Sequence, residues 1–387
     1  MNVGSADGGS VPVRFGQLQK AGCSAHQPAD PLVLLLEEMV RQNASDLHIT
    51  VGSPPRLRID GLITDSATGT VLTTDDTRHF ADSLLTEEQR LRLAGKKELD
   101  FSFTISDMAR FRVNVYHQQD CVAMAIRRLP FVIRPLEELG LPPVVASLAE
   151  RPRGLVLVTG PTGSGKSTTL AAMLDRINRG RHGHILTIED PIEYVHEHRQ
   201  CVVSQREVGR DTESFARALK TALRQDPDVI LLGEMRDPET ISAALTAAET
   251  GHLCLATLHT GSAAETVNRI VDAFPAHQQA QIRSQLASVL EGVVTQLLLP
   301  AVSGIGRYCA AEIMLCTSAV RACIREGRTH QLYSQLQTGG KLGMRTLNDA
   351  LLDLYRRGKV RLKDCLQVSG DVPEFQRMIR ELEGSLC

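Results

Sequence analysis

A glycine-rich loop joins a strand pattern to a helix pattern near the middle of this chain. Residues 154–159 are a short apolar run, typical of a strand buried on both faces, and residues 167–178 have helical periodicity. The segment between them fits G-x-x-x-x-G-K-[ST] at every fixed position. With the residue that follows, it consists of Gly160, Pro161, Thr162, Gly163, Ser164, Gly165, Lys166, Ser167 and Thr168. This order predicts a P-loop α/β domain, whereas a glycine-rich turn without a ligand is the alternative.

The residues of this loop are those that a bound nucleoside triphosphate requires. Glycines let backbone N–H groups point inward around phosphate oxygens, and the following helix directs its positive N-terminal end at them. Lys166 supplies a mobile positive charge for the β- and γ-phosphates, and the Ser167 hydroxyl is a suitable ligand for Mg²⁺. We therefore expect the chain to bind ATP together with Mg²⁺.

The pattern around the loop is that of an α/β fold with a parallel sheet. Short apolar runs occupy residues 185–188, 229–232 and 253–258, and helical periodicity occupies residues 212–223, 238–249 and 277–298. Alternation of this kind predicts a RecA-like core. The end of the chain, from Ser318 onward, is mostly helical. Residues 153–387 are therefore predicted to form an ATPase domain with a helical C-terminal part.

The first third of the chain predicts a different, smaller domain. Residues 1–29 have little apolar periodicity and are expected to be a disordered leader. In residues 30–130, a helix start at Asp30-Pro31 is followed by short segments that alternate at period two, which predicts an α+β domain. Residues 131–152 contain several prolines and are interpreted as a linker around one short helix.

Composition argues against some classes of function. The 387 residues include 43 basic and 45 acidic side chains, and 4% are aromatic, which disfavours a nucleic-acid partner. No apolar run approaches the ~20 residues that span a bilayer, and no signal-peptide pattern opens the chain, so we expect a cytoplasmic protein without membrane insertion. The nine cysteines include no C-x-x-C pair and are expected to be reduced, without zinc.

Two acidic clusters stand where buried strands end, which is the edge at which an α/β sheet presents its ligands. One cluster contains Glu189, Asp190 and Glu193. The other ends a Walker-B-like strand with Gly233 and Glu234, with glycine where an aspartate metal ligand is usual. Hydrolysis needs carboxylates to orient water and to hold the metal. The alternatives are a solvated turn in the first case and a strand that ends in glutamate by chance in the second.

Two histidines bracket the apolar run at 253–258. His252 precedes the run and His259 follows it, so they lie at opposite ends of a strand and on opposite faces. This makes them a poor pair for one metal ion, and a lone histidine is more often a structural residue. At the tip of a strand, however, His259 is in a position to hydrogen-bond a γ-phosphate and to sense its presence.

Taken in order, these four clusters resemble the Walker A, Asp box, Walker B and His box of the secretion and type IV pilus ATPase family. The Gly233-Glu234 ending is similar to that family's own form of Walker B. The resemblance covers about residues 30–370, and residues 45–48 (Ser-Asp-Leu-His) are similar to the opening of the family's PAS-like N-terminal domain. It implies an α/β fold with a RecA-like P-loop ATPase core and a smaller α+β PAS-like domain before it.

The same resemblance implies roles for particular residues. Glu193 matches the general base that acts on water, Glu234 matches the carboxylate at the Mg²⁺ site, and His259 matches the residue near the γ-phosphate. Arg112 and Arg127 lie in stretches similar to the part of the N-terminal domain that offers arginines to the ATP site. The alternative for each arginine is a solvated charge on a strand.

The family also implies an assembly and a cellular place. Its members are homo-hexamers that bind ATP between subunits, so the resemblance implies a ring at the cytoplasmic face of the inner membrane. The partners implied are an inner-membrane pilus platform protein and related pilus ATPases. Residues 319–326 (AVRACIRE) resemble the C-terminal AIRNLIRE motif of retraction-type members, with Ala322 and Cys323 in place of Asn and Leu.

We therefore expect a hexameric motor that drives pilus retraction by hydrolysing ATP. The two changes in the retraction motif leave the direction of the motor open, so an accessory or assembly-direction pilus or type II secretion ATPase is the main alternative. A nucleic-acid translocase on the same core would be stimulated by DNA or RNA. A small-molecule kinase would form ADP together with a phosphorylated acceptor.

Overall fold

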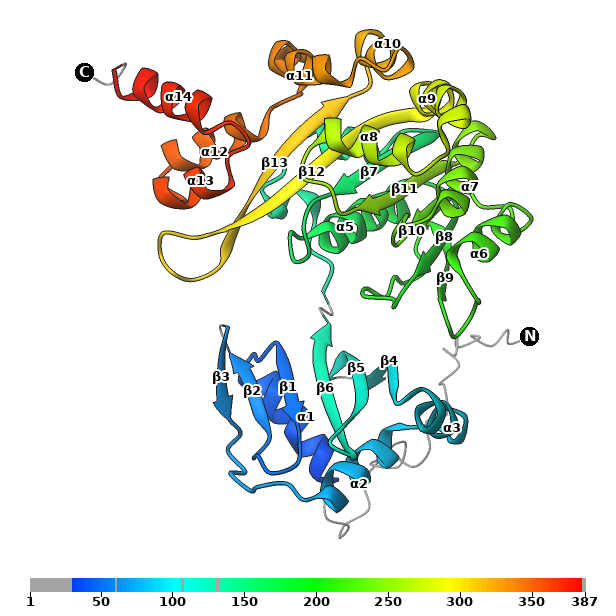
Figure 1. The fold of residues 1–387 in the computed structure, drawn as a ribbon, viewed down its shortest axis with the longest axis vertical. Coiled ribbons are helices and arrows are strands. Elements are labelled where there is room, and N and C mark those ends of the chain that lie inside the picture. The colour runs from blue at the N-terminus through cyan, green and yellow to red at the C-terminus, as the bar shows by residue number, and fades with distance from the viewer. Residues whose placement is uncertain (1–29, 60, 106–107, 130–131, 385–387) are drawn as a thin grey trace, which may run out of the picture. The chain divides into compact units, whose positions relative to one another are not determined.

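The computed structural model describes residues 30–59, 61–105, 108–129 and 132–384 (Figure 1). The chain divides into two compact units, Met1–Phe131 and Val132–Cys387, each with hydrophobic clusters of its own. The leader expected at residues 1–29 lies outside the described residues.

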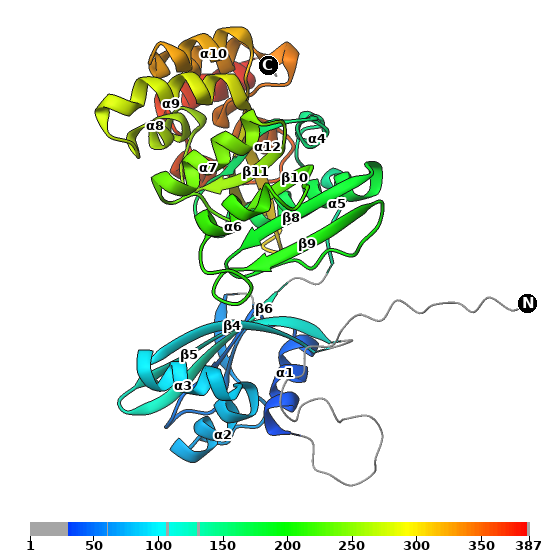
Figure 2. The same cartoon turned by 90° about the vertical axis from the view of Figure 1, so that its right-hand side faces the viewer.

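The N-terminal unit is an antiparallel sheet packed against helices (Figure 2). Alternation along its strands buries one face, as in β5, where Phe111, Val113 and Val115 are fully buried beside helical core residues. Asp30 caps the first helix by accepting a hydrogen bond from the Leu32 N–H at 2.9 Å. The strands lie in the order β3-β2-β1-β6-β5-β4. The elements are α1 (Pro31–Arg41), β1 (Asp46–Ile49), β2 (Arg56–Ile59), β3 (Leu62–Asp65), α2 (Thr74–Leu84), α3 (Glu87–Lys96), β4 (Glu98–Ile105), β5 (Ala109–Gln118) and β6 (Cys121–Leu129).

The C-terminal unit is built on a seven-stranded sheet in the order β13-β12-β7-β11-β10-β8-β9. The strands from β12 to β9 are parallel, and β13 joins the edge beside β12 in the antiparallel direction. Their bounds are β7 (Gly154–Thr159), β8 (Gly183–Glu189), β9 (Cys201–Glu207), β10 (Val229–Leu232), β11 (Leu253–Leu258), β12 (Leu290–Pro300) and β13 (Arg307–Leu315).

Helices cover both faces of this sheet, which explains why its central strands are continuous apolar runs. In β7, Leu155 and Leu157 pack into one buried layer with α6 to α9, whereas Val156 and Val158 pack into the other with α5. This is the RecA-like arrangement expected from the sequence. The helical elements are η1 (Leu136–Leu139), α4 (Val144–Ala149), α5 (Lys166–Gly180), α6 (Phe215–Ala222), α7 (Pro238–Glu249), α8 (Ala263–Asp272), α9 (Ala276–Val289), α10 (Ser318–Arg325), η2 (Thr329–Gln331), α11 (Leu332–Thr338), η3 (Gly340–Leu342), α12 (Leu347–Arg356), α13 (Leu362–Val368) and α14 (Val372–Gly384).

One predicted helix is wrong in its second half. The helix expected over 277–298 ends as α9 at Val289, and the chain continues directly into the strand β12. β12 contains the β-branched run Val293, Val294 and Thr295 and pairs with β7 on one side and β13 on the other. Leucines on both sides of this run mimic helical periodicity. The pairing with β7 and β13 makes the segment a strand and not a helix.

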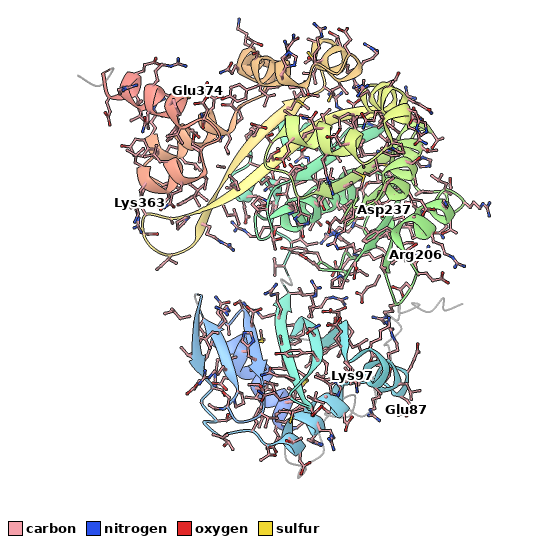
Figure 3. The ribbon with its side chains drawn as sticks, in the orientation of Figure 1. Glu87, Lys97, Arg206, Asp237, Lys363 and Glu374 are labelled. Carbon is pink, nitrogen blue, oxygen red and sulfur yellow. The ribbon has the colours of Figure 1, made fainter. Side chains whose placement is uncertain are left out.

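The C-terminal helices have a smaller core of their own around Phe375 and Leu351. Glu374 (Figure 3) joins α11, α12 and α14, because it accepts hydrogen bonds from Gln337 Nε2 at 2.7 Å, from Asn348 Nδ2 at 2.8 Å and from the Tyr333 hydroxyl. Within the described residues, we find no helix with the length and apolar content needed to cross a bilayer.

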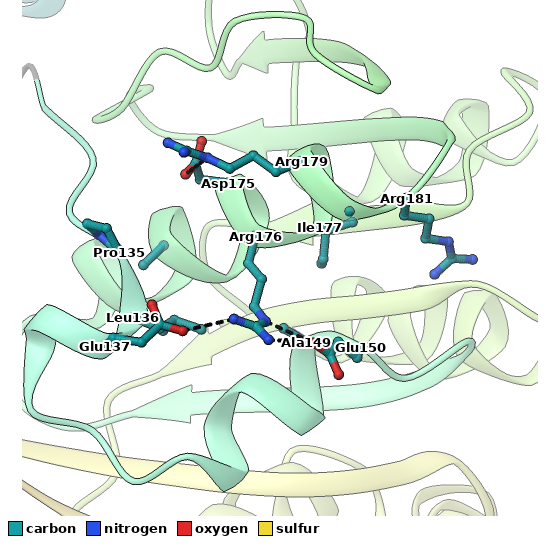
Figure 4. A pocket seen from close by; sticks show the side chains of 12 residues that line it. Pro135, Leu136, Glu137, Ala149, Glu150, Asp175, Arg176, Ile177, Arg179 and Arg181 are labelled. Carbon is teal, nitrogen blue, oxygen red and sulfur yellow. Dashed lines mark hydrogen bonds and ion pairs between the residues drawn. The ribbon is translucent and has the colours of Figure 1, made fainter.

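A pocket of about 590 Å³ lies where η1 and α4 pack on α5 (Figure 4). Arg176 crosses it and donates hydrogen bonds to Glu137 at 2.9 Å and to Glu150 at 2.7 Å. The segment predicted as a linker is thereby tied to the helix that follows the phosphate-binding loop. The pocket is lined by the C-terminal half of that helix, so it is separate from the loop at the helix N-terminus.

Candidate functional site

The glycine-rich loop forms a cradle whose shape depends on its glycines. Gly160, Gly163 and Gly165 have φ angles of +134°, +79° and +91°, a region that favours glycine. A Cβ at Gly160 would lie 2.3 Å from the carbonyl oxygen of Gln296 on β12, so a side chain there would displace the loop. The hydroxyls of Thr159 and Thr295 hydrogen-bond at 2.8 Å and fix β12 beside the start of the loop.

The cradle has unpaired hydrogen-bonding groups of the kind that a phosphate satisfies. α5 begins at Lys166, and no side chain of the described residues caps its first N–H groups. The Ser164 hydroxyl is buried and has no hydrogen-bond partner among the residues that the structure describes. Donors that converge at the N-terminus of a 15-residue helix make a suitable anion site.

Lys166, His259 and Glu234 form a continuous hydrogen-bonded chain beside the cradle. Lys166 Nζ donates to the carbonyl oxygens of Gly160 at 2.7 Å and Pro161 at 3.1 Å, and lies 3.4 Å from His259 Nδ1. His259 Nε2 lies 3.3 Å from Glu234 Oε1. With Nδ1 accepting from Lys166, Nε2 carries the proton that it donates to Glu234. The three sequence-predicted residues therefore lie within one network.

Burial and charge act in opposite directions on these groups. Burial lowers the pKa of Lys166, and the negative charges of Glu234 and Glu193 partly offset this effect. Burial alone would raise the pKa of Glu234, but a 2.7 Å ion pair with Arg236 and the hydrogen bond from His259 hold that pKa below its ordinary value. Glu234 is therefore kept as a carboxylate, the form that ligates a metal.

Sheet order explains why these residues meet. β7, β11, β10 and β8 are adjacent and parallel, so the residues that follow their carboxyl ends share one edge of the sheet. Gly233 follows β10 at this edge. A Cβ there would lie 3.2 Å from Glu189 Cα and 3.3 Å from the Ile188 carbonyl oxygen, which leaves little room for the aspartate usual in Walker B.

Glu193 lies on the connection that follows β8, in a half-buried position close enough to raise the pKa of Lys166. Its backbone N–H bonds the carboxylate of Glu189. Burial raises the pKa of Glu189 to about 7, while hydrogen bonds from Thr187 and Gln205 act against this rise. Of the cluster Glu189, Asp190 and Glu193, Glu193 is the carboxylate whose charge acts on Lys166.

Two interactions that the sequence did not predict hold this connection in place. The hydroxyls of Tyr194 and Thr168 hydrogen-bond at 2.8 Å, which ties the residue after Glu193 to the helix beside Ser167. The side-chain amide of Gln205 on β9 bonds the same connection. No spacing or residue class marks Gln205 in the sequence. The backbone of a long irregular segment needs side-chain hydrogen-bond partners. That general requirement is the only hint in the sequence that a polar side chain near this connection would bond to it.

The remaining candidates have separate environments. His252 bonds the Ala247 carbonyl oxygen at 2.9 Å, a structural role at the other end of β11 from His259. In the described ranges, no group of three or more His, Cys, Asp or Glu side chains is arranged to hold a metal ion. Burial raises the pKa of Cys254 to about 12, as expected of an inert core cysteine.

Arg112 and Arg127 lie in the N-terminal unit, directly opposite each other on the paired strands β5 and β6. Arg127 Nε lies 2.7 Å from Asp46 Oδ1, and Arg112 Nε lies 3.7 Å from Asp100 Oδ1. Arg127 thus has a close partner, whereas Arg112 has a loose and solvent-exposed one.

The segment 319–326 forms most of α10. Val320, Cys323 and Ile324 are buried, and Arg325 is exposed. Arg321 donates to the carbonyl oxygens of Ala287 and Ser288 and pairs with Glu291, at 2.7 to 2.9 Å, so it anchors this helix to the end of α9 and the start of β12.

Comparison with known proteins places this geometry in context. Residues 26–305 match the family model described as "Type II/IV secretion system protein". Over 340 residues the chain is 48% identical to the type IV pilus retraction ATPase PilT of Pseudomonas aeruginosa, which covers 88% of this chain and 98% of that protein. It is 50% identical over 289 residues to the twitching motility protein of Neisseria gonorrhoeae, covering 75% and 77% of the two chains. A crystal structure of the pilus retraction motor PilT with bound ADP matches with a TM-score of 0.84 and 48% identity, covering 89% of this chain and 99% of that one.

Proposed function

Because the chain belongs to the type II/IV secretion system protein family, we propose that it is the ATP-hydrolysing motor of type IV pilus retraction, working as a homo-hexamer. The observation that carries the proposal is the meeting of Lys166, His259 and Glu234 beside the glycine-rich loop. The relatives support the same activity, since one is named a pilus retraction ATPase and another a twitching motility protein.

ATP is the proposed substrate, and its phosphates fit the donors that converge on the cradle. Gly160–Ser167 would surround the phosphates with N–H groups, and the buried Ser164 hydroxyl would gain the partner that it lacks. Lys166 would exchange its bonds to Gly160 and Pro161 for phosphate oxygens. Mg²⁺ bound with the nucleotide would neutralise charge on the phosphate oxygens, and Ser167 and Glu234 are the residues that would hold it.

Glu193 is proposed as the general base that takes a proton from the attacking water. Lys166 stabilises the charge that develops on the transferred phosphoryl group, in a site where burial makes that charge interaction strong. His259 lies between Lys166 and Glu234, so it is placed to respond when Lys166 moves to a phosphate. Repeated around a ring, such cycles of binding and hydrolysis would supply mechanical work.

The proposed partners follow from the family. The ring would act on an inner-membrane pilus platform protein, at the cytoplasmic face of the inner membrane, and related pilus ATPases would share that platform. ATP would bind between subunits, with Arg112 and Arg127 offered to the site of a neighbouring chain. An arginine supplied by a neighbouring chain stabilises negative charge of the transition state that the P-loop alone does not neutralise.

Replacing Arg112 by alanine is expected to lower ATP turnover by roughly 10- to 100-fold, less than the ~10³–10⁵ of a sole arginine finger because Arg127 shares the role. Arg112 is the cleaner test, since Arg127 also pairs closely with Asp46 and its loss would destabilise the N-terminal unit. Phosphate release by assembled protein measures the effect. Arg56→Ala, which breaks an exposed pair with Asp65 in the same sheet, is the control. Equal activity of Arg112→Ala and Arg56→Ala would contradict the proposed role.

Deletion of the gene tests the proposed function in the cell. A strain that lacks the retraction motor should keep or accumulate surface pili and lose twitching motility, and the wild-type chain should restore motility. Loss of surface pili would favour the assembly-direction alternative instead. Stimulation of the purified ATPase by DNA or RNA would favour a translocase.

A further inference from the structure

The segment that carries Glu193 is long and lacks regular structure. Residues 190–200, all described, contain neither helix nor strand, although they connect the neighbouring parallel strands β8 and β9. Such a crossover usually contains a helix, whose internal hydrogen bonds hold the chain in place. Here the backbone groups of the connection need other partners, and those partners set the position of Glu193.

Gln205 on β9 supplies two of these partners, both for backbone groups that directly follow Glu193 in the chain. Its Nε2 donates to the Tyr194 carbonyl oxygen at 2.9 Å, and its Oε1 accepts from the His196 N–H at 2.8 Å. Nε2 also lies 3.2 Å from Glu189 Oε1. The orientation of the amide is fixed, because one end meets a carbonyl oxygen and the other an N–H group. A glutamine spans the two backbone groups with one donor and one acceptor, which a carboxylate or an ammonium group cannot do.

Other side chains complete the hold on the connection. Glu207, two residues along the same strand face, accepts from the Ile192 N–H at 3.2 Å. The buried Asn178 of α5 bonds the far end, donating to the Glu197 carbonyl oxygen at 2.7 Å and accepting from the Cys201 N–H at 3.3 Å. Ile192 and Tyr194, the residues on either side of Glu193, are therefore both fixed from β9.

We propose that Gln205 is a positioning residue for the general base, which it holds in reach of the attacking water by bonding the backbone on the far side of Glu193. This inference rests on the proposed function, in which Glu193 is the base. Hydrolysis is sensitive to the position of a catalytic group, since a misplacement of about 1 Å costs on the order of 100-fold in rate. The cradle is built by a different segment, Gly160–Ser167, so the proposal gives Gln205 no part in nucleotide binding.

Gln205→Met keeps the size of the side chain and removes its hydrogen bonds. We expect kcat for ATP hydrolysis to fall by about 10- to 100-fold, while the KM for ATP and the affinity for a fluorescent ADP analogue stay within about twofold. Gln205→Glu keeps the acceptor for the His196 N–H but turns an oxygen, in place of the donor, toward the Tyr194 carbonyl oxygen and Glu189 Oε1, so it should lose at least as much turnover. It also keeps the test decisive if the methionine variant does not fold.

A double-variant cycle separates positioning from general structural damage. If Gln205 acts through Glu193, Gln205→Met should change the residual turnover of Glu193→Gln by less than about twofold. A full additional loss in that background, or a wild-type kcat for Gln205→Met alone, would overturn the inference. Wild-type turnover by Glu193→Gln would instead remove the base assignment on which it rests.

Ser204→Ala is the matched control. Ser204 is the neighbour of Gln205 on β9, and its hydroxyl bonds His184 Nε2 at 2.9 Å, away from the catalytic connection. This variant loses one side-chain hydrogen bond from the same strand and should keep wild-type kcat. A loss equal to that of Gln205→Met would mean that any weakening of β9 slows the enzyme, which contradicts a specific role for Gln205.

Discussion

Lys166→Ala is expected to lower ATP turnover by about 100- to 1000-fold, the range seen when one charge-stabilising donor is removed from an active site. Lys166 Nζ lies 3.4 Å from His259 and bonds two carbonyl oxygens of the loop, so it stands at the centre of the proposed phosphate site. Loss of a hydrogen bond to a charged group should also weaken nucleotide binding by roughly 10- to 100-fold. Phosphate release and titration with a fluorescent ADP analogue measure the two effects.

The same substitution should leave the empty protein as stable as the wild type, or make it more stable. Burial lowers the pKa of Lys166, so the folded state holds its proton less tightly than the unfolded state does. The charge therefore costs stability at neutral pH, and this cost disappears as the pH rises through the folded pKa toward 10.5. The stability gained by Lys166→Ala should accordingly shrink in alkaline buffer, as urea unfolding at two pH values would measure.

Lys220→Ala is the control for Lys166→Ala. Lys220 is an exposed lysine of the same unit, and it pairs with Glu239 at the surface. Its removal should change neither turnover nor nucleotide affinity, because exposed pairs contribute little. Full turnover by Lys166→Ala would show that the glycine-rich loop is not the hydrolytic site, whatever the family resemblance implies.

The sequence predicts the central sheet well because burial on both faces leaves a simple pattern. β7, β10 and β11 coincide with the apolar runs at 154–159, 229–232 and 253–258, and α7 coincides with the helix expected at 238–249. The strand β12 was missed because its leucines also suit a helix, and pairing with β7 decides its conformation. The local sequence pattern therefore identifies strands that are buried on both faces. It fails for a segment such as β12, whose secondary structure depends on pairing with a strand that is distant in the sequence.

The sequence predicts those residues of the candidate site that directly follow the buried strands of the sheet. Glu234 and His259 follow neighbouring parallel strands, so their meeting near Lys166 follows from the order of the sheet. Tyr194 and Gln205 could not be predicted in this way, because their partners depend on the path of an irregular connection. The structure also supplies a reason for Gly233 that the sequence lacks, namely the close approach of β8.

Glu193→Gln is expected to lower ATP turnover by about 100- to 10,000-fold, the range for loss of a general base. Glutamine keeps the size of the side chain and its backbone bonds, but it cannot take a proton from water. The P-loop, Lys166 and Ser167 remain intact, so ATP should still bind with near wild-type affinity. The variant would therefore hold ATP without hydrolysing it, unlike Lys166→Ala, which weakens both steps.

Glu197→Gln is the matched control for this variant. Glu197 lies on the same connection as Glu193 and carries an exposed carboxylate that lies 3.6 Å from Arg199. Its neutralisation removes the same charge from the same segment without touching the proposed water site, so turnover should stay at the wild-type rate. Equal losses in the two variants would assign the effect to charge on the connection. A loss confined to Glu193→Gln, with ATP still bound, would identify proton transfer as the missing step.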